Sequence, residues 1–130
     1  MRHLIGCCLI LLLLGCNEKS EFNSNDISEI YIADFVSDAP EQCEPEDVDL
    51  SNNDVKRFFQ LAREVEHKVL HDHYNYAPCA IEGTLKLQQQ SCTWQVRAGA
   101  TGNIKCGKQY RYFACDNCAE LFSPVTDLQK

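Results

Sequence analysis

Six cysteines between positions 43 and 118 limit what this chain of 130 residues can fold into more than any other feature. They are Cys43, Cys79, Cys92, Cys106, Cys115 and Cys118. An even number of cysteines in a small exported domain predicts up to three disulfides, although spacing alone does not choose the pairing. Without export, the same residues would compete as zinc or redox sites. The first residues of the chain indicate whether it is exported.

Residues 1–15 have the pattern of a secretory signal. Met1-Arg2-His3 is a short positive start, an apolar run follows from Leu4 to Leu14, and the small residue Gly15 stands before Cys16. The run is far shorter than the ~20 residues that a membrane-spanning helix needs. We therefore predict a cleaved signal and an oxidising destination.

Leu13-Leu14-Gly15-Cys16 resembles the lipobox of bacterial lipoproteins. The resemblance implies cleavage before Cys16 and attachment of lipid to its sulfur. Asn17, rather than an aspartate, then implies the outer membrane, facing the periplasm. The resemblance covers residues 1–16 only, and the remainder of the chain matches no family by its motifs.

Two alternatives to this cleavage site exist. Leu4-Ile5-Gly6-Cys7 also fits the lipobox pattern, but cleavage there would leave almost no apolar segment before the cut and an apolar stub from Leu9 to Leu14 after it. In the second alternative the signal is a plain secretory one and Cys16 is an ordinary thiol. Cleavage before Cys16 uses the whole apolar run and is the interpretation that we adopt.

Composition divides the remaining chain into a tether and one small domain. Residues 16–26 are polar and predict a lipidated flexible tether, and residues 27–130 suit a single small domain. Residues 17–54 contain twelve acids and one base, Lys19. This excess of acids argues against a nucleic-acid partner, because a protein that binds nucleic acid presents a basic surface. It also argues against electrostatic binding to anionic lipids, so we expect the protein to contact the membrane through its lipid alone.

The hydrophobic pattern predicts an α+β fold. Residues 27–36 are rich in β-branched and aromatic side chains and predict a strand, and residues 37–50 predict a loop that Cys43 fixes to the body. Ser51 is a candidate N-cap for one long helix that reaches about Tyr74. From Ala80 the period changes to two. We therefore expect one long helix packed on an antiparallel β-meander of three to four strands, with an N-terminal strand and disulfide staples.

The order strand, helix, meander in this prediction resembles cystatin-like topology. Independently of this resemblance, Cys92 and Cys106 lie on neighbouring predicted strands across a short hairpin, so we predict that they pair. Cys43 and Cys79 would then pair with Cys115 and Cys118, in either order.

Two other roles for the cysteines remain open. Cys115-Asp116-Asn117-Cys118 has the spacing of a redox pair, but the Asp116 charge disfavours a thiolate and no βαβ pattern surrounds it. Cys92, Cys106, Cys115 and Cys118 contain the four thiols of a zinc site, although a single C-x-x-C is a weak zinc pattern. An oxidising compartment favours structural disulfides over both.

A histidine cluster lies at the end of the predicted helix. His67 and His71 are four residues apart and Glu64 precedes them by one turn, an arrangement that can bind zinc or copper. Lys68-Val69 stands where an H-E-x-x-H motif would need its glutamate. A solvated helix face explains the same residues, so we expect no metal and no other cofactor.

Two groups of residues are candidates for binding a protein partner. The loop contributes carboxylates that suit a partner with a basic surface, and the helix end contributes a polar aromatic patch. The first group is Glu41, Glu44, Glu46, Asp47 and Asp49, and the second is His73, Tyr74 and Tyr76. No nucleophile motif and no phosphate-binding glycine loop is present, which favours a binding protein over an enzyme.

These features predict a lipid-anchored periplasmic module that acts by protein–protein contact. Its most favoured role is that of an inhibitor or immunity protein against an envelope-acting enzyme or effector. One alternative is a structural or assembly lipoprotein of the cell envelope. Another is a periplasmic protein that binds metal or uses thiols.

Overall fold

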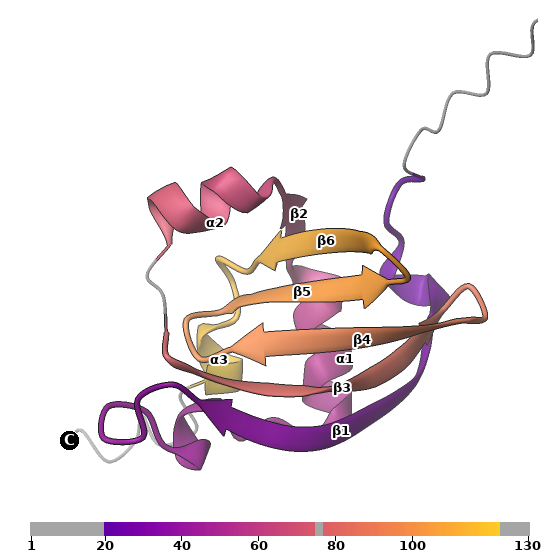
Figure 1. Cartoon of the computed structure of the whole chain (residues 1–130). Helices are drawn as coiled ribbons and strands as arrows, with labels where there is room; N and C mark the ends of the chain where they lie inside the picture. Colours follow the sequence, from indigo (N-terminus) through magenta and orange to yellow (C-terminus); the bar gives the residue numbers. More distant parts are fainter. Residues whose placement is uncertain (1–19, 75–76, 123–130) are drawn as a thin grey trace, which may run out of the picture.

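A six-stranded antiparallel sheet forms the body of the protein (Figure 1), in a computed structural model that describes residues 20–74 and 77–122. The strand order is β1-β3-β4-β5-β6-β2. The strands are β1 Ile27–Ser37, β2 Arg63–Val65, β3 Cys79–Leu87, β4 Gln90–Arg97, β5 Thr101–Cys106 and β6 Gln109–Ala114. The helices are α1 Asn52–Leu61, α2 His67–His73 and α3 Ala119–Phe122, with 3₁₀ turns η1 Ser24–Asp26 and η2 Pro45–Val48. No helix within these described ranges has the length and apolarity to cross a membrane.

The predicted fold class is wrong in its main feature. The chain has no single long helix from Ser51 to Tyr74, because β2 separates α1 from α2 and pairs with β6. The predicted N-terminal strand and the meander β3 to β6 are present, but they form one six-stranded sheet with β2. One long helix on a meander of three to four strands, with its cystatin-like layout, therefore does not describe this chain. A continuous helix would leave the β6 side of the sheet without a neighbouring strand. Instead β2 covers the backbone edge that β6 would otherwise expose.

The start of α1 lies where the sequence predicted it. Ser51 Oγ accepts a hydrogen bond from the Asp54 backbone nitrogen at 3.1 Å, and Asp54 Oδ2 accepts one from the Ser51 nitrogen at 3.0 Å. This reciprocal capping box satisfies two donors at the helix start. The local signal was therefore sufficient for the beginning of the helix and not for its end.

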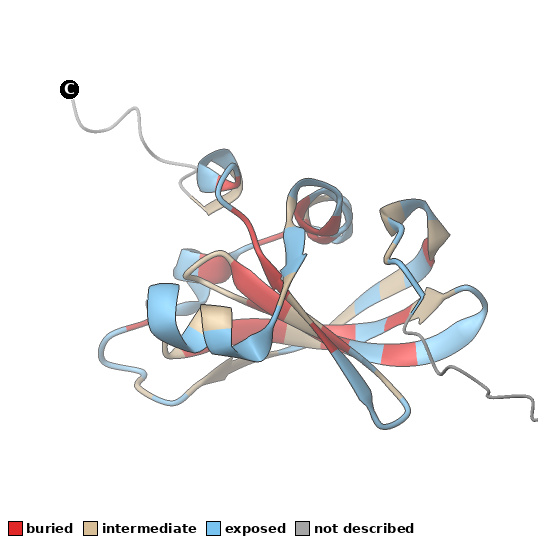
Figure 2. Ribbon diagram, turned by 90° about the horizontal axis from the view of Figure 1, so that it is seen from above, coloured by how far each residue is buried: buried red, intermediate tan, exposed pale blue. Residues whose placement is uncertain are grey.

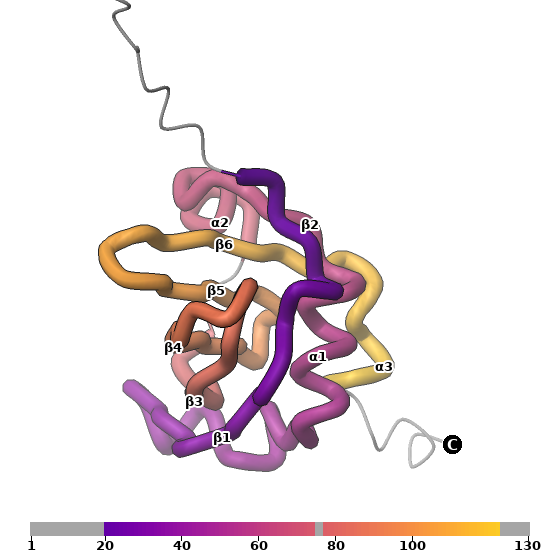
Figure 3. Tube along the Cα trace, turned by 90° about the vertical axis from the view of Figure 1, so that its right-hand side faces the viewer, coloured from indigo at the N-terminus to yellow at the C-terminus, as the bar shows by residue number. Residues whose placement is uncertain are grey.

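The core lies between α1 and one face of the sheet, and α2 lies on the opposite, outer face (Figures 2 and 3). Phe58 and Phe59 of α1 are fully buried. The Phe59 ring centroid is 5.2 Å from that of Phe113 and 6.5 Å from that of Trp94. Edge-on aromatic contacts of this kind add to the burial of apolar area. The inner face is therefore occupied, and the polar outer face is the one that is open to other uses.

Strand β1 bulges as it crosses β3. Its register shifts between Ser28 and Tyr31 and again between Ile32 and Asp34. At this point a Cβ atom on Gly83 would overlap the carbonyl oxygen of Tyr31. Only glycine allows this close approach of two backbones.

The segment from Ser20 to Asp26 packs against the body, although its polar composition predicted part of a flexible tether. Arg111 is 7% exposed, its Nη1 lies 2.9 Å from Glu64 Oε2, and its Nη2 donates to the Ser20 carbonyl. The Phe22 ring centroid lies 4.7 Å from that of Phe113. The buried guanidinium needs several acceptors and the Phe22 ring needs an apolar contact, and docking of this segment supplies both. Cys16 and the three residues after it lie outside the described residues.

Three disulfides staple the domain, and they confirm the disulfide prediction. They join Cys43 to Cys79, Cys92 to Cys106 and Cys115 to Cys118. The Cys92–Cys106 pair was predicted correctly, whereas the pairing of Cys43 and Cys79 with the last two cysteines was wrong. The cause is the β1–β3 register, which sets Ser37 opposite Cys79 and brings the residues after β1 to that cysteine. All four sulfurs of the alternative zinc set are used in disulfides.

Candidate functional site

Residues 37–50, hereafter the acidic segment, join β1 to α1 and contain six acids and no base. Within them, Cys43, Val48 and Leu50 are buried at 5%, 0% and 5% exposure. The predicted partner-binding carboxylates all belong to exposed residues: Glu41, Glu44, Glu46, Asp47 and Asp49. The segment therefore directs its apolar side chains inward and its negative charges toward solvent.

Several bonds fix the acidic segment in place. The Cys43–Cys79 disulfide attaches it to β3, and Ser37 Oγ donates to the Cys43 carbonyl at 3.3 Å. Asp47 Oδ2 accepts a hydrogen bond from the Glu44 nitrogen at 2.7 Å, which caps η2. A loop held in this way has little conformational freedom to lose when a partner binds.

Tyr74, at the end of α2, takes part in a network with two charged residues. Its hydroxyl donates to Asp116 Oδ1 at 2.6 Å and accepts from Arg63 Nη2 at 2.9 Å, while Arg63 Nε lies 3.2 Å from Asp116 Oδ2. The hydrogen bond from Tyr74, followed by that from Arg63, holds the pKa of the Asp116 carboxyl below its ordinary value. The hydrogen bond that Arg63 donates to the Tyr74 hydroxyl, followed by its bond to Asp116, raises the pKa of Arg63. The network joins α2 and β2 to the loop closed by the Cys115–Cys118 disulfide.

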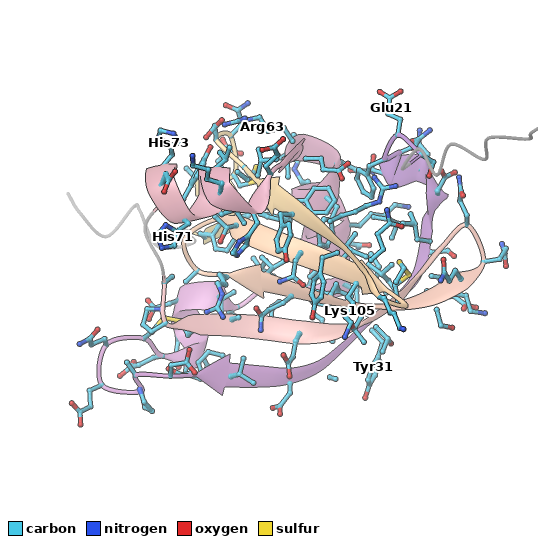
Figure 4. The ribbon with its side chains drawn as sticks, turned by 45° about the horizontal axis from the view of Figure 1, so that its top comes forward. Glu21, Tyr31, Arg63, His71, His73 and Lys105 are labelled. Atoms are coloured by element: carbon cyan, nitrogen blue, oxygen red, sulfur yellow. A yellow bond between two sulfur atoms is a disulfide. The ribbon has the colours of Figure 1, made fainter. Side chains whose placement is uncertain are left out.

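The structure does not bring the two predicted partner-binding groups into one patch. In Figure 1, α2 lies at the upper left and the acidic segment at the lower left, with the β4–β5 turn between them. Figure 4 shows His73 on the side of α2 that points away from the strands. Tyr76 lies outside the described residues. The acidic segment and the end of α2 are therefore separate surfaces.

The metal-binding candidates also separate. Glu64 lies on β2 and pairs with Arg111, whereas His67 begins α2 and its ring centroid lies 4.7 Å from that of Tyr112 on the outer face. Glu64 would share a helix face with the histidines only if the helix were continuous, and β2 interrupts it. His67 and His71 still lie on one face of α2. Over residues 20–74 and 77–122, one group brings three ligand atoms within 4.8 Å of one another, namely Cys43, Asp47 and Cys79. Its two sulfurs form a disulfide, so this group offers no metal site.

A cleft of about 470 Å³ lies between α2 and the outer face of the sheet. One wall of the cleft is a face of α2, whose contributing residues are three or four positions apart or adjacent in the helix. The other wall is formed by β4, β5 and β6. The helix side contributes His67, Leu70, His71 and Tyr74, and the sheet side contributes Gln95, Arg97, Thr101, Gly102, Asn103 and Tyr112. Figure 4 shows His71 on the side of α2 toward the strands.

Sequence reasoning missed the sheet side of this cleft. Alternation along β4 placed Gln95 and Arg97 opposite the apolar Trp94 and Val96, and that was the available signal. It did not indicate that α2 would fold back over this face, because the helix was expected to continue along the core.

Comparison with known proteins finds no match to this chain among protein-family models, curated sequences or solved structures. Its function is therefore argued from its own residues.

Proposed function

We propose that this chain is a lipid-anchored binding protein of the cell envelope that acts by protein–protein contact. Its most favoured role is that of an inhibitor or immunity-type protein against an envelope-acting enzyme or effector with a basic surface. One observation carries the proposal, namely that the acidic segment presents its six carboxylates on exposed residues of a backbone fixed by a disulfide.

Rigidity and charge together favour this role. Negative charge concentrated on one segment steers a basic partner toward it and raises the association rate. A preformed loop then loses little conformational entropy on binding, which favours a slow dissociation rate. Both properties suit a protein that occupies a basic active-site cleft and forms an interface of standard size with its partner.

The position of the anchor is compatible with this role. Cys16 precedes the docked residue Ser20 by four residues, so lipid on Cys16 would hold the Ser20 end within about 14 Å of the membrane. The acidic segment follows the opposite end of β1, an 11-residue strand that can extend about 35 Å. The anchored molecule would thus present its acidic segment away from the lipid surface (Figure 1).

The partner is tested with the full chain as bait on an envelope extract. A triple variant, Glu41→Gln with Glu46→Gln and Asp49→Asn, removes three carboxylates that do not take part in the capping hydrogen bonds of η2. Its matched control neutralises three exposed acids elsewhere on the surface, Glu21, Glu66 and Glu120, each to Gln. We expect the first variant to slow association about tenfold or more at low salt and the control to change it little.

A captured partner that binds both triple variants equally well would contradict the role of the acidic segment. Capture of nothing in stoichiometric amount would count against protein contact altogether. Co-purification with a structural outer-membrane complex, insensitive to salt, would favour the assembly role instead.

The anchor is tested separately with Cys16→Ser. We expect the unmodified chain to fractionate with membranes and to carry acyl chains on its N-terminal peptide in mass spectrometry. The serine variant should lack the acyl mass and keep the uncleaved signal, residues 1–15. Cys7→Ser is the matched control, and loss of acylation in that variant alone would move the cleavage site to the earlier lipobox-like sequence.

A further inference from the structure

The cleft beneath α2 differs in charge from most of the molecule. The chain has a formal net charge of −7, yet none of the described residues that line the cleft is an aspartate or a glutamate. The lining instead includes Arg97, His67 and His71. The guanidinium of Arg97 gives this concave surface a positive charge, which favours an anion.

Arg97 is held in a defined position at this cleft. Its Nη1 donates to the Ala77 carbonyl at 2.9 Å, on the chain that leads into β3. A guanidinium carries five donors in one plane, which suits the two oxygens of a carboxylate. The nearby acid Glu82 accepts a hydrogen bond from Gln95 Nε2 at 3.3 Å, and this leaves the Gln95 amide oxygen as an acceptor.

The strand residues that line the cleft have no free backbone edge to which an extended peptide could add. β4 and β5 are interior strands with a hydrogen-bonded neighbour on each side, and β6 lies between β5 and β2. Addition of a peptide strand requires a free sheet edge. A ligand in this cleft must therefore be recognised by side chains.

These side chains fit a ligand that combines a carboxylate with hydroxyl groups. Asn103, Gln95 and Thr101 offer amide and hydroxyl groups that can each donate and accept. Leu70 and Tyr112 supply the apolar part of the wall. The volume of about 470 Å³ lies in the range of small-molecule sites, about 300–1,000 Å³.

We propose that this cleft binds an acidic saccharide, with Arg97 on the carboxylate and the neighbouring amides and hydroxyl on the sugar hydroxyls. The carboxylate distinguishes this ligand from a neutral sugar, and the hydroxyls distinguish it from a simple anion. The cleft and the acidic segment are separate surfaces, so the proposal stands or falls independently of the protein partner.

The test is an NMR titration of the ¹⁵N-labelled full chain in detergent micelles at constant ionic strength. The probes are methyl β-D-glucuronide, methyl β-D-glucoside, which lacks the carboxylate, and inorganic phosphate, which lacks the sugar. We expect the glucuronide to shift amide signals of β4, β5 and α2 saturably, and the other two to bind about tenfold more weakly or not at all.

Variants then assign the binding to Arg97. Arg97→Gln should weaken glucuronide binding about tenfold or more, whereas Arg57→Gln, on the exposed side of α1, should leave it unchanged. Because Arg97 also bonds to Ala77, Asn103→Ala provides a second variant that leaves that bond in place and should weaken binding severalfold. Unshifted amide signals outside the cleft would show that both variants remain folded.

Three results would overturn the proposal. The first is the absence of any saturable shift with the glucuronide. The second is equal binding of phosphate or of the glucoside, which would reduce the cleft to a general anion or sugar surface. The third is undiminished glucuronide binding by both folded variants.

Discussion

At the scale of single residues, the contacts of Asp116 set how its charge responds to pH. Its carboxylate accepts from the Tyr74 hydroxyl and from Arg63, and both bonds favour the ionised form. Its pKa in the folded protein is therefore lower than in the unfolded chain. The network adds stability above the unfolded-state pKa, and this contribution is lost as the pH falls through the lower folded-state value.

We predict that Tyr74→Phe raises the pKa of Asp116 toward its ordinary value, because it removes the largest cause of the shift. The midpoint is measured from the carboxyl ¹³C chemical shift during an acid titration. Tyr31→Phe, at a tyrosine that is 63% exposed on β1, is the matched control and should leave the midpoint unchanged. An unchanged midpoint in Tyr74→Phe would mean that the hydroxyl does not bond to Asp116 in solution.

At the scale of secondary-structure elements, the β1–β3 pair depends on the missing side chain at Gly83. We predict that Gly83→Ala destabilises the fold by about 3 kcal/mol or more, because the new methyl group meets a backbone carbonyl that cannot move aside. Gly107→Ala is the comparison, since that position has space for a Cβ but a φ of 62°. It should cost about 1 kcal/mol. Urea unfolding measures both, and equal costs would contradict the steric explanation.

The helices and strands also show how much of the fold could be predicted from the sequence. The start of α1 was correct because the capping box is local, and the alternation along β4 marked a strand whose apolar residues are buried. On β6 the alternation was less informative, because Arg111 and Phe113 are buried and Tyr110 is exposed. The division of the long helix was missed because the segment between Ala62 and Glu66 contains no Gly or Pro, and Val65 and Val69 continue the helical spacing.

What interrupts that helix is distant in the chain. Val65 pairs with Tyr112 in the sheet, and Glu64 lies 2.9 Å from Arg111. Neither partner can be inferred from the residues around the break. The cleft depends on this break in the helix, because the chain passes from the core side of the sheet to its outer face at β2, the edge strand. Tertiary contacts thus overrode local helical propensity, and the candidate ligand site was missed together with them.

At the scale of the whole molecule, the Cys43–Cys79 disulfide closes the longest covalent loop, with a sequence separation of 36. We predict that replacing both cysteines by alanine lowers the free energy of unfolding by about 3–4 kcal/mol. The double alanine variant of Cys115 and Cys118, whose separation is 3, should lose only about 2 kcal/mol. Urea unfolding compares them. A smaller loss for the Cys43–Cys79 variant than for its comparison would contradict loop closure as the origin of the stabilisation.

The variant in which Cys43 and Cys79 are both replaced by alanine also tests the proposed function. Its acidic segment keeps every carboxylate but loses the covalent attachment to β3, so charge and rigidity are separated. Partner association at low salt should remain fast, because it follows charge, while dissociation becomes faster, because ordering the loop now costs entropy. Unchanged dissociation would show that the disulfide is not what preorganises the segment.

If the chain is lipid-anchored as proposed, its orientation at the membrane depends on the docking of residues 20–26. We predict that Phe22→Ala releases this segment, because it removes the ring that packs on Phe113 and over which Arg111 lies, at 6.0 Å from the ring centroid. Hydrogen exchange followed by mass spectrometry should then show rapid exchange of the Asn25 and Asp26 amides, both of which are bonded to Asn23 in the native segment. Phe35→Ala, a truncation of another partly buried phenylalanine that packs against the core, is the matched control. It should reduce global stability and preserve protection at Asn25 and Asp26. Rapid exchange of these amides already in the unaltered chain would mean that the segment is free, and the acidic segment would then have no fixed direction relative to the membrane.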